Sequence, residues 1–154
     1  MARDWLAEPL PTELEEVREA ITDVLAQFDA QYWIDVEDSG RYPQDFVDVL
    51  QQGGWLSLLI PEEYGGGGAT LNEAAVVLEA INRWGGAGTL VHAQLYTMGS
   101  VLRFGSAEQK QRWLPQIAAG DVRLQSMGVT EPDAGTDTTR IRTFAENRGD
   151  HYVV

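Results

Sequence analysis

Apolar residues that recur at helical spacing, interrupted by glycine and proline, dominate the first 121 residues of this chain of 154. In the first such stretch the apolar positions are Leu14, Val17, Ile21, Val24, Leu25, Phe28 and Tyr32. This period of three and four residues, with acidic residues between, predicts one long amphipathic helix over residues 13–36. Thr12 and Glu15 have the spacing of a capping box at its start. The chain therefore begins as a helical protein.

Two more helices are predicted before residue 86. One begins near Pro43, a residue suited to the first helical position, and ends at Gly53. The other begins at a second capping box, formed by Thr70 and Glu73, and ends at Gly85.

Two further helices are predicted over about residues 89–104 and over residues 107–119. Ser106 is the expected N-cap of the last helix, and Gly120 marks its end. Pro115 inside it predicts a bend, because proline removes one intrahelical hydrogen bond.

The sequence Pro-Glu-Glu-Tyr-Gly-Gly-Gly-Gly at residues 61–68 predicts a loop, because four glycines favour neither helix nor strand. A glycine-rich loop can cradle a phosphate, but no Lys-Ser/Thr pair follows, so a nucleotide P-loop is disfavoured. The favoured interpretation is a flexible loop between two helices.

After residue 121 the pattern changes to β-type runs at residues 123–130, 140–146 and 151–154. Residues 147–150, Asn-Arg-Gly-Asp, are typical of a hairpin connection. We therefore predict a mainly α protein: an N-terminal helical bundle domain over residues 1–121, then the opening strands of a β domain over 122–154. Because the sequence stops within the last run, we expect the β domain to be truncated here.

Composition excludes several classes of function. The net charge of −13, with eleven Lys and Arg residues, argues against a nucleic-acid-binding surface. The absence of cysteine excludes disulfides, thiolate metal sites and a cysteine nucleophile. No apolar run approaches the roughly 20 residues that a membrane-spanning helix needs. The N-terminus has neither the apolar core of a secretion signal nor an Arg-rich transit peptide, so the expected location is cytoplasmic.

Residues 128–137, Gly-Val-Thr-Glu-Pro-Asp-Ala-Gly-Thr-Asp, combine an extended segment with a tight turn. Pro132 has no N–H and favours extended geometry at Glu131, so strand pairing must stop there. Gly135 lets main-chain amides approach a ligand closely, and Thr130 and Thr136 add hydroxyl groups. The segment is thus suited to bind an anionic cofactor through its backbone.

This segment resembles the flavin-binding signature of the acyl-CoA dehydrogenase family, which reads small-aliphatic-Ser/Thr-Glu-x-x-small-Gly-Ser/Thr-Asp. PEEYGG at residues 61–66 and FGSxEQKxRWLPxIAxGD at residues 104–121 also resemble the family. One position departs from the pattern: Arg140 stands where the family has a small residue. That cation could alter the loop after the turn, or it could lie near a phosphate of CoA or of the flavin.

The resemblance implies a flavoprotein oxidoreductase of fatty acid metabolism that uses FAD to desaturate an acyl-CoA thioester. The residues implied to contact the flavin are Met127, Gly128, Val129, Thr130, Gly135 and Thr136. Thr136 is also implied to contact the acyl-CoA substrate. The catalytic base of the family lies in its C-terminal helices, so we expect it beyond Val154 and expect this chain to be inactive alone. Glu131 is interpreted as a structural carboxylate.

The resemblance further implies an electron-transfer flavoprotein or a similar acceptor as partner, and a homo-oligomer for the full-length protein. Two alternatives stay open: a non-catalytic helical module or subunit that pairs with a second chain, and an acyl-CoA oxidase or related flavin monooxygenase. No metal is expected, because His92 and His151 lack partners at metal-site spacing.

Overall fold

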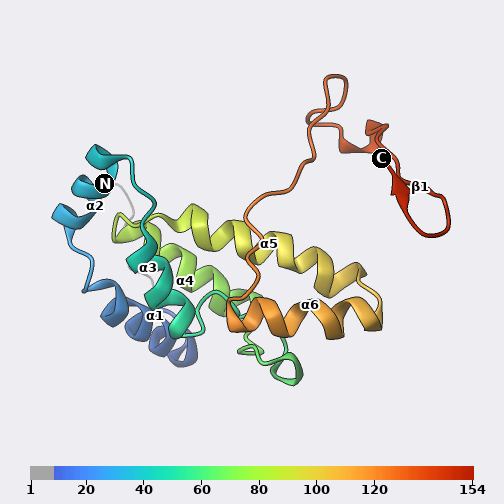
Figure 1. Cartoon of the computed structure of the whole chain (residues 1–154). Helices are drawn as coiled ribbons and strands as arrows, with labels where there is room; N and C mark the ends of the chain where they lie inside the picture. The colour runs from blue at the N-terminus through green and yellow to red at the C-terminus, as the bar shows by residue number, and fades with distance from the viewer. Residues whose placement is uncertain (1–8) are drawn as a thin grey trace.

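Helices make up most of the structure, a computed structural model that describes residues 9–154 (Figure 1). Its α-helices are α1 (Thr12–Leu25), α2 (Ala30–Ser39), α3 (Gln44–Gln52), α4 (Leu71–Arg83), α5 (Gly88–Phe104) and α6 (Ala107–Ala119). The shorter elements are the 3₁₀ turns η2 (Glu62–Tyr64) and η3 (Thr138–Arg140) and the strands β1 (Glu146–Asn147) and β2 (Tyr152–Val153). The prediction of a mainly α chain with a small β region at its C-terminal end is confirmed. Residues 1–8, which carry part of the expectation about targeting segments, lie outside the described residues.

One apolar core holds the helical body together. α1 packs against α4, α4 against α5, and α5 against α6. The largest fully buried apolar side chains come from α1, α3, α4, α5, α6 and the α3–α4 connection: Ile21, Leu25, Phe46, Leu50, Leu56, Ile60, Val77, Ile81, Met98, Leu114 and Ile117. Each such side chain contributes about 1.5–3 kcal/mol by leaving water, so the core dominates the stability of this body.

The single helix predicted over residues 13–36 is wrong, because the chain turns between Leu25 and Ala30. Asp29 caps the second helix: its carboxylate accepts a hydrogen bond from the amide of Tyr32 at 2.9 Å. Phe28, in the turn, is buried and packs edge-on against Phe46 with 5.4 Å between ring centroids. The cap and the buried ring together outweigh the helical periodicity that continues through this stretch.

The predicted helix caps are correct at two of three places. Thr70 with Glu73 and Ser106 with Gln109 form complete capping boxes. The capping box at Thr12 is wrong, because Pro11 is the N-cap and its carbonyl accepts the amides of Leu14 and Glu15, each at 3.0 Å. The last helix has the predicted bounds and continues through Pro115.

The β region contains less pairing than the sequence predicts. Residues 123–130 and 140–145 form no strand, whereas β1 and β2 form an antiparallel hairpin across residues 148–151. A β-type composition favours extended backbone, but a strand exists only where a second segment supplies hydrogen bonds. The predicted strands at 123–130 and 140–146 are therefore wrong, because these segments find no pairing partner among the described residues. The exception is Glu146, which belongs to β1.

The glycine-rich loop at residues 61–68 is hydrogen-bonded to its own surroundings rather than open. The amides of Gly65, Gly66, Gly67 and Gly68 donate to the carbonyls of Glu62, Pro61, Ser57 and Ile60. No glycine amide of this run is left for a phosphate. Gly66 also lies so close to the preceding segment that an added Cβ would stand 2.2 Å from the carbonyl oxygen of Ile60. The loop is thus a closed turn, and glycine is required for close approach.

Replacing Gly66 by alanine should destabilise the protein by about 1–3 kcal/mol, because the Ile60 carbonyl must move to accept the methyl group. Gly99 in α5 is the matched control, since an added Cβ there meets nothing within 4 Å. Gly99→Ala should instead stabilise by about 0.5–1 kcal/mol through helix propensity. Urea unfolding of both variants measures the difference. Equal stability of Gly66→Ala and the parent chain would contradict this account of the loop.

Candidate flavin-contact segment

The candidate site lies on the segment that follows α6. The chain runs back across α5 and then leaves the helical body (Figure 1). Residues 123–130 are extended and end in a tight turn, where Glu131 and Ala134 exchange backbone hydrogen bonds of 3.0 and 3.2 Å. Ala134 is 2% exposed, so the turn is closed by packing as well. The turn expected around Pro132 is therefore present, although no strand precedes it.

The six residues expected to contact a flavin lie on this segment: Met127, Gly128, Val129, Thr130, Gly135 and Thr136. All are exposed except Val129, which is half-buried. Among the described residues, none of their main-chain amides donates a hydrogen bond. The segment thus presents a row of open N–H donors, which is the surface an anionic group or a ring carbonyl would need.

Glu131 has a structural role. Its carboxylate oxygens accept the amides of Arg142 at 2.9 Å and Thr143 at 2.7 Å, which ties the turn to the residues after η3. A side-chain hydrogen bond from Thr143 and these two backbone bonds hold the pKa of Glu131 below its ordinary range. A carboxylate that stays ionised and accepts these bonds is a poor proton acceptor for catalysis.

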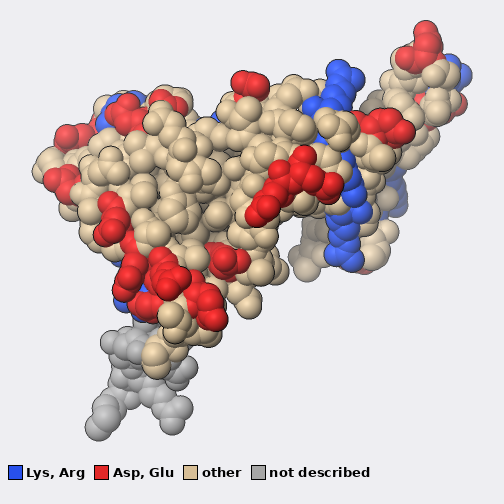
Figure 2. Space-filling model, turned by 90° about the horizontal axis from the view of Figure 1, so that it is seen from below, with Lys and Arg blue, Asp and Glu red and all other residues tan. Residues whose placement is uncertain are grey.

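Three arginines follow the turn in the sequence, and two have acidic partners. Arg142 lies 3.7 Å from the Asp133 carboxylate, and Arg148 lies 2.8 Å from Glu146. Arg140, at the end of η3, is exposed and forms no ion pair with the described residues. On the face shown in Figure 2, acidic side chains form several groups over the helical body. An anionic ligand would therefore depend on local donors rather than on the overall field.

Two hydrogen bonds that involve side chains hold the start of this segment to the helical body. Gln94 of α5 accepts the amide of Leu124 through Oε1 at 2.8 Å. Arg123 donates from Nη1 to the Tyr42 hydroxyl, also at 2.8 Å. Sequence reasoning missed these residues. A glutamine on the apolar face of a helix, next to Leu95 and one turn from Val91, is the signal that could have identified Gln94.

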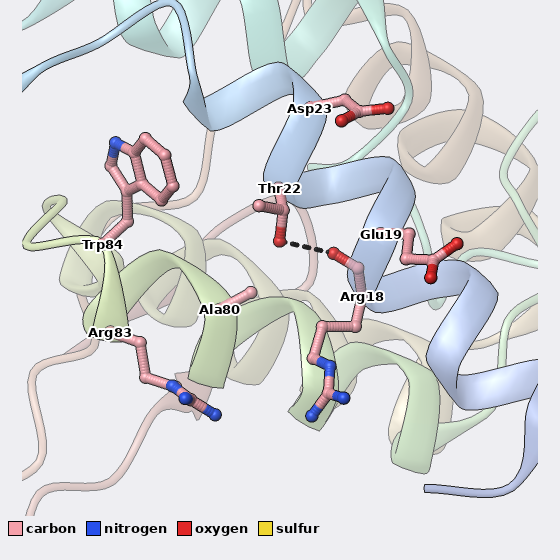
Figure 3. Close-up of a pocket in the computed structure, with 7 residues that line it drawn as sticks. All are labelled: Arg18, Glu19, Thr22, Asp23, Ala80, Arg83 and Trp84. Atoms are coloured by element: carbon pink, nitrogen blue, oxygen red, sulfur yellow. Dashed lines mark hydrogen bonds between the residues drawn. The ribbon is translucent and has the colours of Figure 1, made fainter. Parts of the chain in front are cut away.

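A groove with a volume of about 670 Å³ lies elsewhere, between α1 and the end of α4 (Figure 3). Its lining residues are Arg18, Glu19, Thr22, Asp23, Ala80, Arg83 and Trp84. Arg18 pairs with Glu15, and Arg83 lies 3.4 Å from Glu79. The lining thus carries two arginines and two carboxylates, Glu19 and Asp23, and the groove has no net preference for an anion.

The histidines do not form a metal site. His92 lies on α5 with its ring 5.0 Å from that of Tyr96, and His151 contacts Asp150 at 2.7 Å. Over residues 9–154 no cluster of three His, Cys, Asp or Glu side chains could hold a metal ion. Over the same residues no helix is both long and apolar enough to span a membrane.

Comparison with known proteins decides the family. The family described as "Acyl-CoA dehydrogenase, N-terminal domain" matches residues 11–121. The chain belongs to the acyl-CoA dehydrogenase family. Among curated relatives, "Probable acyl-CoA dehydrogenase FadE25" of Mycobacterium tuberculosis is 35% identical over 147 residues, which is 94% of this chain. Acyl-CoA dehydrogenase FadE12 of the same species is 32% identical over 143 residues, or 92% of this chain. In both cases the chain spans only 37% of the relative's length.

Solved structures of this family have the same fold. The acyl-CoA dehydrogenase of Geobacillus kaustophilus superposes with a TM-score of 0.78 at 30% identity, over 96% of this chain and 39% of that one. An acyl-CoA dehydrogenase of Bacillus anthracis, solved with FAD, superposes with a TM-score of 0.73 at 27% identity, over 96% of this chain and 26% of that one. A chain of the ChsE4–ChsE5 complex of M. tuberculosis superposes with a TM-score of 0.71 at 26% identity, over 95% of this chain and 37% of that one. The chain thus corresponds to an N-terminal part of the acyl-CoA dehydrogenase fold.

Glu131→Gln should loosen the tie between the turn and residues 142–143. Glutamine keeps one acceptor oxygen, so one of the two amides loses its partner and should exchange with solvent about three- to tenfold faster. Because the folded pKa of Glu131 is lowered, the tie in the parent chain is fully present above the ordinary glutamate pKa and is lost as pH falls through the lowered value.

Amide exchange and amide chemical shifts followed by NMR from neutral to acidic pH measure both effects. Glu63→Gln, at an exposed position of η2, is the control and should leave both amides unchanged. If the amides of Arg142 and Thr143 behave identically in Glu131→Gln and the parent chain, the structural role of Glu131 is refuted.

Proposed function

We propose that this chain supplies one wall of the flavin and acyl-CoA sites of an FAD-dependent acyl-CoA dehydrogenase. The observation that carries the proposal is the row of open main-chain amides at Met127–Thr130 and Gly135–Thr136, on the segment that carries the family's signature. Family membership supports the same cofactor, since a related structure was solved with FAD. In this proposal the six residues contact the flavin, and Thr136 also touches the substrate.

The donors on this segment fit the group they would hold. When bound, FAD accepts the hydride from the β-carbon of the acyl chain, and negative charge develops on its ring. The N–H groups of Val129 and Thr130 would hold the ring and would stabilise charge that develops on it, because main-chain donors already in place need little reorganisation. The hydroxyl groups of Thr130 and Thr136 add donors that can turn toward either ligand.

The base that removes the α-proton is not assigned to this chain. Glu131 accepts two main-chain amides and has a lowered pKa, so it lacks the properties of a general base. The chain spans 37% of FadE12, and we place the base in the part of such a protein that this chain does not cover. In the same proposal the 154-residue chain alone is inactive, and the complete protein passes electrons to an electron-transfer flavoprotein or a similar acceptor.

Pairing with a second chain is the alternative that a specific observation favours. The ChsE4–ChsE5 structure, which shares this fold at 26% identity, is a complex of two named proteins. In that arrangement this chain contributes its flavin wall to a site completed by another polypeptide.

FAD binding by a completed chain is the test of this function. A chimera that continues after Val154 with the remaining residues of FadE12 should purify yellow, and an acyl-CoA should bleach its flavin under anaerobic conditions. The 154-residue chain should hold FAD much more weakly, because it supplies only part of the contacts. Absorbance spectra and anaerobic titration measure both. A folded chimera that stays colourless in excess FAD contradicts the proposal.

Within the chimera, Thr136→Val should slow flavin reduction by about three- to tenfold, the loss expected for one hydrogen bond to a reacting ligand. Thr138→Val, two residues further on and also exposed, is the matched control and should reduce at the parent rate. Stopped-flow absorbance measures both rates. Equal effects of the two substitutions would remove Thr136 from the site.

A further inference from the structure

Gln94 is a fully buried polar residue in an apolar environment. Its side chain is 0% exposed, and its neighbours on the same face of α5 are Val91, Leu95 and Met98, all buried. Its Oε1 accepts the amide of Leu124, 30 residues later, at 2.8 Å. Burying a side-chain amide costs free energy, and the bond to Leu124 offsets that cost at Oε1, whereas Nε2 is buried without a hydrogen-bond partner among the described residues.

The bond lies directly before the flavin-contact segment. Leu124 itself packs against the core, as does Val122. From Gln125 to Thr130, by contrast, no main-chain amide donates a hydrogen bond among the described residues. Nε2 of Gln125 lies 3.5 and 3.4 Å from the carbonyl oxygens of Leu90 and Leu124, so both of these hydrogen bonds are weak. The Gln94–Leu124 bond is therefore the last short contact between main chain and helical body before Met127.

A contact at this place controls where the following residues lie. An extended chain advances about 3.3 Å per residue, so Met127 and Thr130 stand about 10 and 20 Å along the chain from Leu124. A modest rotation about Leu124 therefore displaces them by several ångströms. Arg123 adds a second contact with the helical body, since it donates to the Tyr42 hydroxyl at 2.8 Å. That second contact is formed by a side chain and leaves the Leu124 peptide free to turn.

We propose that Gln94 is a positioning residue: through the Leu124 amide it fixes the direction in which the flavin-contact segment leaves α5. This role rests on the proposed function, because the segment matters for catalysis only if it binds the flavin. Gln94 does not touch the cofactor. Its burial keeps water from competing for the Leu124 amide, so the segment is held in one orientation before a ligand arrives.

The chain offers a matched set of variants. Gln94→Met keeps the length of the side chain and removes the acceptor, whereas Gln94→Glu keeps an oxygen at the same place. Thr97→Val, one turn further along α5, is the control, because the buried Thr97 hydroxyl has no hydrogen-bond partner among the described residues. Any effect of the α5 packing itself should then appear in Thr97→Val as well.

The first measurement uses the 154-residue chain and needs no flavin. The bond that trypsin cleaves after Arg123 contains the Leu124 amide, so its cleavage reports release from Gln94. Gln94→Met should be cleaved there about tenfold faster and should show about tenfold faster amide exchange at Leu124. Gln94→Glu should return most of the protection, and Thr97→Val should match the parent. Unchanged cleavage and exchange in Gln94→Met overturn the proposal.

The second measurement uses the chimera with FadE12. Gln94→Met should bind FAD about tenfold more weakly and shift the visible flavin spectrum, with Gln94→Glu closer to the parent. If Gln94→Met releases Leu124 but leaves FAD affinity and spectrum unchanged, the positioning role is overturned while the proposed function stands. If the parent chimera binds no FAD, the proposed function and the positioning role both fail, although the cleavage result still describes the Gln94–Leu124 bond.

If Gln94→Met does not fold, Gln94→Asn replaces it. Asparagine is shorter by one methylene and so withdraws the acceptor oxygen from Leu124, and the same results are expected.

Discussion

Burial of one apolar core between α1, α3, α4, α5 and α6 is the constraint on which the rest of this chain depends. After residue 120 only Ala134 is buried, so the C-terminal segment contributes almost nothing to its own stability. Its place in space is set by what the helical body offers it: an apolar surface for Val122 and Leu124, and the side-chain oxygen of Gln94 as acceptor for the Leu124 amide. A functional surface of open backbone donors can exist only because another part of the molecule supplies the folding free energy.

Local signals in the sequence predicted much of the helical body. The capping boxes at Thr70 and Ser106 place both helix starts correctly, because caps involve residues three apart and need no tertiary information. Periodicity failed between Leu25 and Ala30, where apolar spacing continues although the backbone turns. The competing signal was the Asp29 cap with a buried Phe28, and only packing against Phe46 decides between the two. The predicted strands failed for a related reason, since pairing is non-local.

The candidate site shows the same division. The turn at Glu131–Ala134 follows from Pro132 and from small residues nearby, so the sequence alone located it. The sequence predicted a structural role for Glu131 but not its hydrogen bonds, because the partners, Arg142 and Thr143, are eleven and twelve residues away. The partner of Gln94 could not be predicted for a stronger form of this reason: a glutamine on an apolar helix face indicates a buried hydrogen bond, but nothing near Leu124 in the sequence indicates that its amide is the donor.

The glycine run at residues 65–68 has a consequence for how this part of the fold can vary. By composition it looks like a spacer whose length is arbitrary. Its four amides, however, each donate to a particular carbonyl between Ser57 and Glu62, and the amide of Ala69 donates to the carbonyl of Leu58. One residue more or fewer would shift every one of these pairs out of register, so the α3–α4 connection behaves as a corner of fixed length. Insertions should accumulate elsewhere among related chains, and this corner should keep its residue count even where its sequence drifts.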